Sequence, residues 1–185
     1  MVNIIIQLSK YVIIILMAAY TFSCFSIFTR NYEDEEKRVL IRQDVLMFLL
    51  QFAAFGTMYL ATKDIRILFL YAVLTVILLA VILLYNLIYP NVSRLVVNNM
   101  CMLMSVGFIM IARLNFDKCV KQFVIAVFGT VIMFLVPWLL KTVKSFRNFG
   151  GIYCISGLVL LCAVLLGNKV YGANLTLSIG AFSVQ

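Results

Sequence analysis

The residues of this chain that could do chemistry are few, and the densest group is the acidic run Glu33 to Glu36. General acid/base catalysis needs carboxylates that face one substrate, whereas consecutive acidic residues point in different directions. Two of these acids also precede bases at the i,i+4 spacing of helical ion pairs, as in Glu33 with Lys37. The segment Arg30 to Asp44 is therefore interpreted as a solvated loop or short helix, and no catalytic residue is named.

Sulfur-containing residues are the second candidate for chemistry. The chain has five cysteines, no CxxC pair and no histidine. The cysteines are Cys24, Cys101, Cys119, Cys154 and Cys162. Four of them lie in apolar blocks, where cysteine behaves as a small hydrophobe, and Cys119 lies in a charged connection. The methionine-rich stretch 100–110 has no histidine and only the single cysteine Cys101, which indicates adaptable packing, so no metal site and no cofactor are predicted.

The apolar blocks that hold these residues are too long for a soluble domain. Hydrophobic residues make up 65% of the 185 residues and charged residues only 12%, which is typical of a protein solvated by a bilayer. The predicted fold is an all-α polytopic transmembrane bundle of about six spans. They cover residues 11–28, 45–61, 67–89, 95–112, 123–140 and 152–167.

Polar residues in two of the blocks indicate helix packing. The second block contains Gln51, Gly56 and Thr57, which suit a helix interface better than lipid, so this helix is expected inside the bundle. No predicted span contains an ionisable residue, which argues against a self-contained transporter, channel or protease. A cavity lined by Gln51, Asn98 and Asn99 stays open. From the residues alone, the chain is a scaffold or accessory subunit, or less favourably a lipid or small-molecule carrier.

The net charge of +8 comes from bases scattered between the apolar blocks. Such residues pair with lipid headgroups, so membrane lipids are expected partners and nucleic acid is not. Total basic residues do not fix the orientation, but the loop Lys141 to Arg147 has no acidic partner and favours the cytoplasm. The tail Asn168 to Gln185 is broken by glycines and is expected to be a loop, not a seventh span.

Three segments in the second half of the chain resemble the SEDS family of cell-wall synthesis proteins, the FtsW/RodA/SpoVE group. SVGFIMIARL, residues 105–114, resembles the end of the family's first helix. Lys121 and Gln122, followed by FVIAVFGTVIMFLVPWLL, resemble the start and body of its second helix. YGANLTLSIGAFSVQ, residues 171–185, is similar to the segment after its third helix. The matched positions of that segment are Gly172, Ala173, Gly180 and Gln185.

The resemblance implies a peptidoglycan glycosyltransferase of elongation, division or sporulation. Such enzymes polymerise lipid II at the outer face of the bacterial cytoplasmic membrane, with a class B penicillin-binding protein as partner. The resemblance also implies a cytoplasmic Lys141 to Arg147 loop and an external Asn168 to Gln185 segment. Lys121 and Lys169 become candidate pyrophosphate contacts. No metal or cofactor is implied.

The resemblance covers less than half of the chain. Residues 1–94 match no part of the family core and are expected to form a three-helix membrane extension, and residues 95–185 the start of the core. In the family, the final glutamine precedes Pro-Ser-Glu, and the essential acidic residue follows much later. The resemblance therefore predicts an amino-terminal fragment that is not active alone.

Overall fold

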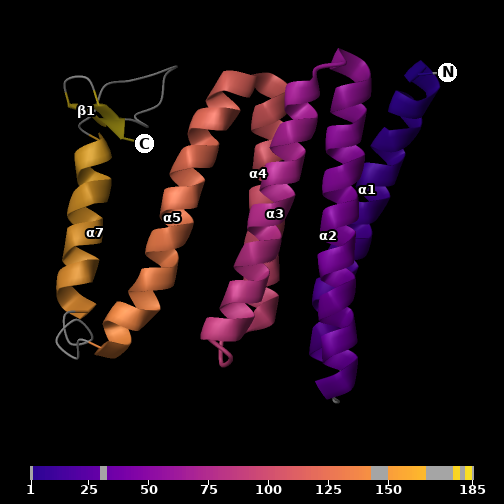
Figure 1. The fold of residues 1–185 in the computed structure, drawn as a ribbon. Helices are drawn as coiled ribbons and strands as arrows, with labels where there is room; N and C mark the ends of the chain where they lie inside the picture. The colour runs from indigo at the N-terminus through magenta and orange to yellow at the C-terminus, as the bar shows by residue number, and fades with distance from the viewer. Residues whose placement is uncertain (1, 30–32, 143–149, 166–176, 180–181, 185) are drawn as a thin grey trace. The chain divides into compact units, whose positions relative to one another are not determined.

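The structure of this chain is a computed structural model that describes residues 2–29, 33–142, 150–165, 177–179 and 182–184 (Figure 1). Its elements are α1 (Val2–Ser26), the 3-10 helix η1 (Ile27–Thr29), α2 (Glu33–Thr62), α3 (Ile65–Ile88), α4 (Arg94–Leu114), α5 (Phe116–Thr142), α7 (Gly150–Leu165), β1 (Leu177–Ile179) and β2 (Phe182–Val184). Five helices within these ranges are long and apolar enough to cross a bilayer, α1 to α5. The prediction of an all-α membrane bundle is confirmed, with one short hairpin added.

The chain divides into two compact units, Met1–Val131 and Ile132–Gln185. In the first unit, α2 packs against α1, α3 and α4. Its buried residues Met47, Leu50 and Ala54 recur at intervals of three and four, which places them on one face of the helix. The prediction that the second block lies inside the bundle is therefore confirmed.

The start of α2 corrects the sequence interpretation of residues 30–44. The predicted solvated segment is helical from Glu33 onward and continuous with the membrane span, so α2 begins well before residue 45. Val39 and Leu40 are buried together with Ile27 of η1, and Leu95 of α4 packs against them. These contacts stabilise an amphipathic extension on which Glu36, Lys37 and Arg38 are exposed. Acidic residues in its first turn also favour the positive end of the helix dipole.

The other predicted spans agree with helices whose ends differ. Residues 67–89 correspond to α3 and residues 95–112 to α4, each within two residues. The first span begins earlier, at Val2, because the polar residues of the first ten do not interrupt the helix. The fifth begins at Phe116 instead of residue 123.

The turn between α2 and α3 is only two residues long. Lys63 adopts a left-handed conformation with φ of 56°, and its amide donates to the carbonyl of Tyr59 at 2.7 Å, which ends α2. Asp64 then caps α3, because its Oδ1 accepts from the amide of Arg66 at 3.0 Å. Lys63 therefore ends α2, and the next residue, Asp64, caps the start of α3.

Asp64→Ala is expected to lower the free energy of unfolding by about 1 kcal/mol, because α3 loses its amino-terminal cap. Lys63→Gly is expected to raise it by several tenths of a kcal/mol, since glycine adopts the left-handed conformation without strain. Equilibrium unfolding in mixed detergent micelles measures both changes. If the two substitutions shifted stability in the same direction, this account of the turn would be wrong.

A single residue, Asn115, connects α4 to α5. Its amide donates to the carbonyl of Ile111 at 2.9 Å, and its side-chain oxygen accepts from the amide of Lys118 at 3.0 Å. The charged residues between the predicted spans 95–112 and 123–140 therefore lie mostly in the first two turns of α5. Cys119, expected in a connection, is instead buried in this part of α5, with its thiol 3.8 Å from the carbonyl of Phe108.

The second unit holds the last part of α5, the helix α7 and the β1–β2 hairpin. The apolar helix α7 has 16 residues, about 24 Å at 1.5 Å per residue, and is shorter than the five spanning helices. The last two residues of the predicted sixth span, 166 and 167, lie outside the described residues. β1 and β2 pair antiparallel with Leu177 opposite Val184, so the described part of the tail is not a span, as predicted.

Candidate functional site

A group of polar side chains lies between α1, α2 and α4 in the first unit, and we call it the polar cluster. It contains Tyr20 and Cys24 from α1, Gln43 and Asp44 from α2, and Arg94, Asn98 and Asn99 from α4. The three helices meet here because their small and polar residues face each other, as is usual where helices pack in a membrane. The cluster is the main candidate site of the first unit.

Asn99 joins α4 to α1. Its side-chain oxygen accepts two hydrogen bonds, from the Tyr20 hydroxyl at 3.0 Å and from the Cys24 thiol at 3.2 Å. The Cys24 sulfur in turn accepts from Nε2 of Gln43 at 3.6 Å, which extends the chain of contacts to α2. One amide of α4 therefore holds two successive turns of α1.

Asn98 joins α4 to α2. Its Nδ2 donates to the carbonyl of Leu40 at 3.3 Å and to Oε1 of Gln43 at 3.4 Å. Asn98 is 1% exposed and Gln43 0%, so both amides are removed from water and lipid. Buried amides at a helix interface fix the axial register of the helices, because any slip leaves their polar groups unpaired.

An ion pair lies at the edge of the cluster. Nη2 of Arg94 is 2.8 Å from Oδ2 of Asp44, and the two side chains are 29% and 15% exposed. Asp44 precedes the predicted span 45–61, but the apolar helix that is long enough to cross a membrane runs from Asp34 to Thr62, so this longer helix does carry an ionisable residue. Arg94 is the first residue of α4, and its charge compensates the carboxylate near the end of the bundle.

Some polar atoms of this region have no hydrogen-bond partner among the described residues. They are Asp44 Oδ1, Arg94 Nε, Asn98 Oδ1, Gln51 Oε1 and Ser105 Oγ. Gln51 does donate through Nε2 to the hydroxyl of Thr75 at 3.3 Å, which links α2 to α3. Within the polar cluster, two acceptor oxygens, Asp44 Oδ1 and Asn98 Oδ1, and one donor, Arg94 Nε, therefore have no partner among the described residues.

The side chains of the polar cluster join helices through hydrogen bonds and an ion pair. The Asp44 carboxylate is engaged by Arg94, and the thiol of Cys24 lies among amide and phenol groups, with no basic side chain bonded to it. A nucleophile needs an adjacent base and an acid/base catalyst needs a free carboxylate or imidazole. Within the described part of the chain, no group of three metal-binding side chains is brought together either. The arrangement fixes helices, and among the described residues its side chains form no acid/base or nucleophile–base pair.

The sequence-predicted motif positions are only partly described. Lys121 and Gln122 are exposed on α5, and Gln122 lines a cavity of about 140 Å³ with Met104 and Phe108. Lys169, Gly172, Ala173, Gly180 and Gln185 lie outside the described residues. The role of Lys121 and Lys169 as pyrophosphate contacts stays a prediction.

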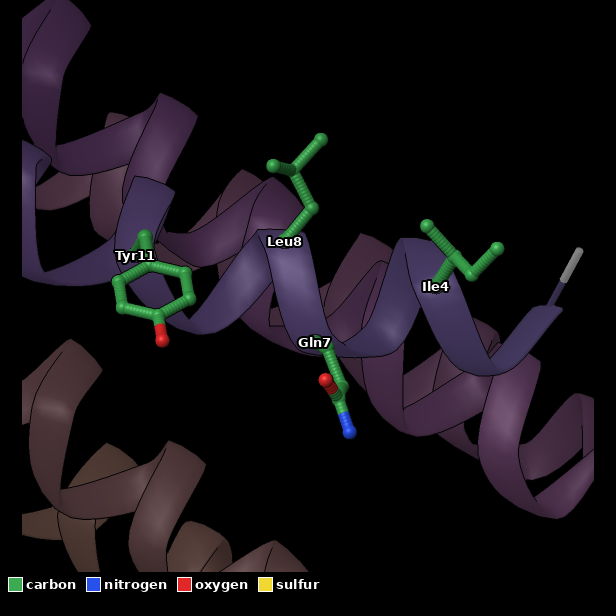
Figure 2. A pocket seen from close by; sticks show the side chains of 4 residues that line it. All are labelled: Ile4, Gln7, Leu8 and Tyr11. Atoms are coloured by element: carbon green, nitrogen blue, oxygen red, sulfur yellow. The ribbon is translucent and has the colours of Figure 1, made fainter.

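A second hollow lies on the outer side of α1, but it is not a binding site. Its volume is about 320 Å³, and all four lining residues come from this one helix. Figure 2 shows Ile4 and Leu8 pointing to one side of the helix and Gln7 and Tyr11 to the other. Side chains that diverge cannot enclose a ligand, so this exposed face suits contact with lipid tails.

Sequence reasoning found Gln51, Asn98 and Asn99, which are polar residues within apolar blocks. It missed Asp44 and Arg94, because each lies just outside a predicted span. A usable signal was the helical spacing of Arg94, Asn98, Cys101 and Ser105, which places them on one face of α4. Tyr20 and Cys24 have the same i,i+4 relation on α1.

The fold and the polar cluster define a class: a multi-pass helical membrane protein whose helices are tied together by buried polar side chains. No family is identified beyond this class. Comparisons with protein-family models, curated proteins and solved structures found no significant match to this chain.

Proposed function

We propose that this chain is the amino-terminal membrane part of a SEDS-like protein of bacterial peptidoglycan synthesis, acting as a scaffold that is not catalytic alone. The observation that carries the proposal is the order of three family-like segments, at residues 105–114, 121–140 and 171–185. In this proposal the catalytic acidic residue belongs to a later part of the protein. Lipid II and a class B penicillin-binding protein are the expected partners, and residues 141–147 face the cytoplasm.

The packing of α4 supports a scaffold role within this proposal. The first SEDS-like segment lies on α4, and α4 is fixed to α1 and α2 by Asn98 and Asn99. The additional helices and the first family-like helix therefore belong to one compact unit. The predicted boundary between residues 94 and 95 concerns family resemblance, and it stays a prediction.

Sequencing the coding region downstream of Gln185 tests the proposal. We expect the reading frame, intact or disrupted, to continue with Pro-Ser-Glu and several further hydrophobic segments. A stop codon directly after Gln185, with no remnant of such segments beyond it, would contradict the SEDS assignment.

The polar cluster favours one second candidate, a stand-alone scaffold or accessory subunit. Polar contacts tie α1, α2, α3 and α4 to one another, which is the arrangement that a scaffold requires. This candidate predicts that the chain co-purifies with a larger membrane protein when a tagged copy is extracted in mild detergent. A chain that is recovered without any stoichiometric partner would contradict it.

A further inference from the structure

A cavity of about 300 Å³ lies at the end of the first unit opposite the polar cluster. It forms where α1 begins, α2 ends, α3 begins and α4 ends, so residues far apart in sequence surround it. Its apolar walls include Ile13, Met58 and Ile109. Four helices contribute to this cavity, in contrast to the hollow on α1 alone.

Two cations line this cavity, Lys10 of α1 and Arg113 of α4, and no acidic residue lines it. Both side chains are exposed, so their charges are available to a ligand. An anionic group placed between them would receive charge-assisted hydrogen bonds from two helices. The cavity therefore selects for negative charge.

Three hydroxyl groups also line the cavity, those of Ser9, Thr57 and Thr62. Each donates its proton to a carbonyl of its own helix, at 2.8 or 2.9 Å. The Thr62 oxygen also accepts from the amide of Asp64 at 3.4 Å, whereas those of Ser9 and Thr57 keep lone pairs that can accept hydrogen bonds from a ligand. A ligand that carries hydroxyl donors beside its anionic group would satisfy both features.

The end of the first unit that holds the cavity is positively charged, like the cavity itself. Its bases are Lys10, Lys63, Arg66, Arg113, Lys118 and Lys121, and its acids are Asp64 and Asp117. At the opposite end, the bases Lys37, Arg38, Arg42 and Arg94 meet the acidic run 33–36 and Asp44. The end that holds the cavity is therefore the more basic of the two, which complements an anionic surface.

The position of the cavity along the spans matches a lipid headgroup. Arg113 is next to the last residue of α4, and Thr62 is the last residue of α2. Lys10 lies further inside α1, but a lysine stem extends toward the interface and brings its ammonium to headgroup level. The volume suits a headgroup and glycerol backbone, with the acyl chains lying in the surrounding bilayer.

We propose that the cavity between α1, α2, α3 and α4 is a binding site for an anionic phospholipid with a hydroxylated headgroup, of the phosphatidylglycerol type. Lys10 and Arg113 contact the phosphate, and the oxygens of Ser9 and Thr57 accept from the two headgroup hydroxyls. This site is independent of the proposed role in peptidoglycan synthesis, since it is built from the first unit alone.

Native mass spectrometry of the full chain, released from nanodiscs of equal phosphatidylglycerol and phosphatidylcholine, tests this site. We expect the wild-type chain to retain phosphatidylglycerol, and the double variant Lys10→Gln, Arg113→Gln to retain about tenfold less, because each base near an anionic lipid adds to its binding. The matched control Arg66→Gln, Lys118→Gln removes the same charge at the same end but leaves the cavity intact. It should retain the lipid within about twofold of wild type.

A filling variant separates the cavity from general charge attraction. Ala61→Leu adds bulk at a lining position and is expected to reduce retained phosphatidylglycerol, whereas Ala72→Leu on the exposed side of α3 should leave it unchanged. Soluble glycerol phosphate in excess should not displace the lipid. Equal losses in the two charge variants, or no loss with Ala61→Leu while helicity by circular dichroism is retained, would overturn the proposal. Displacement by glycerol phosphate would assign the cavity to a free phosphate ester instead and overturn it as well.

Discussion

Arg94→Met should lower the free energy of unfolding of the bundle by about 2–3 kcal/mol, measured by equilibrium unfolding in mixed detergent micelles. The substitution keeps an unbranched side-chain stem but leaves the Asp44 carboxylate without the guanidinium that lies 2.8 Å away. Breaking a fully buried pair costs more, but these side chains are partly exposed, so water screens part of the loss.

A double-mutant cycle separates the pair from its surroundings. Asp44→Asn alone should cost less than Arg94→Met, and the combined variant should recover part of the stability, because no unpaired charge remains. Arg42→Met is the matched control, since Arg42 is exposed on α2 and should change stability by less than about 0.5 kcal/mol. Additive effects of the two substitutions would show that Arg94 and Asp44 do not interact.

Asn99→Leu is expected to cost about 1–2 kcal/mol in the same unfolding assay. The substitution removes the acceptor shared by Tyr20 and Cys24 and leaves two donors of α1 unpaired in an apolar interface. Interhelical hydrogen bonds in membrane proteins contribute about 0.6 kcal/mol on average and up to about 1.7 kcal/mol, so two lost bonds account for this range.

Two further variants show whether this loss comes from the α1–α4 contact. Asn86→Leu replaces an exposed asparagine of α3 and should have little effect. Tyr20→Phe should cost less in the Asn99→Leu background than in the wild-type chain, because the bond is already lost there. An Asn86→Leu effect as large as that of Asn99→Leu would show that any loss of a polar side chain destabilises the bundle.

Composition and block length predicted the helices well, because a continuous apolar run such as residues 67–89 can hardly be anything but a span. The start of α2 could not be predicted in the same way. Its first residues are charged. The apolar residues Val39 and Leu40 stabilise the helix because Ile27 and Leu95 pack against them, and this contact cannot be read from the sequence. Tertiary packing therefore decided where the loop ends and the helix begins.

Some residues of the polar cluster could be predicted from the sequence, but the partner of each residue could not. Asn98, Asn99 and Gln51 are conspicuous in apolar blocks, yet nothing in the sequence assigns Asn99 to Tyr20, which lies 79 residues away. The partner of Asp44 was also hidden, since Arg94 looks like an ordinary base at the end of a helix. These pairs form because α1, α2 and α4 pack against one another in the folded chain.

Asn99 holds α1 and α4 together, and thiol cross-linking can detect this contact in the membrane. The variant Asn99→Cys is treated in intact membranes with a short bifunctional thiol reagent, and linked peptides are identified by mass spectrometry. We predict a link between position 99 and Cys24, and none between Cys24 and position 103 in Leu103→Cys, because Leu103 is exposed on α4. Absence of the first link, or equal yields of both, would contradict the account.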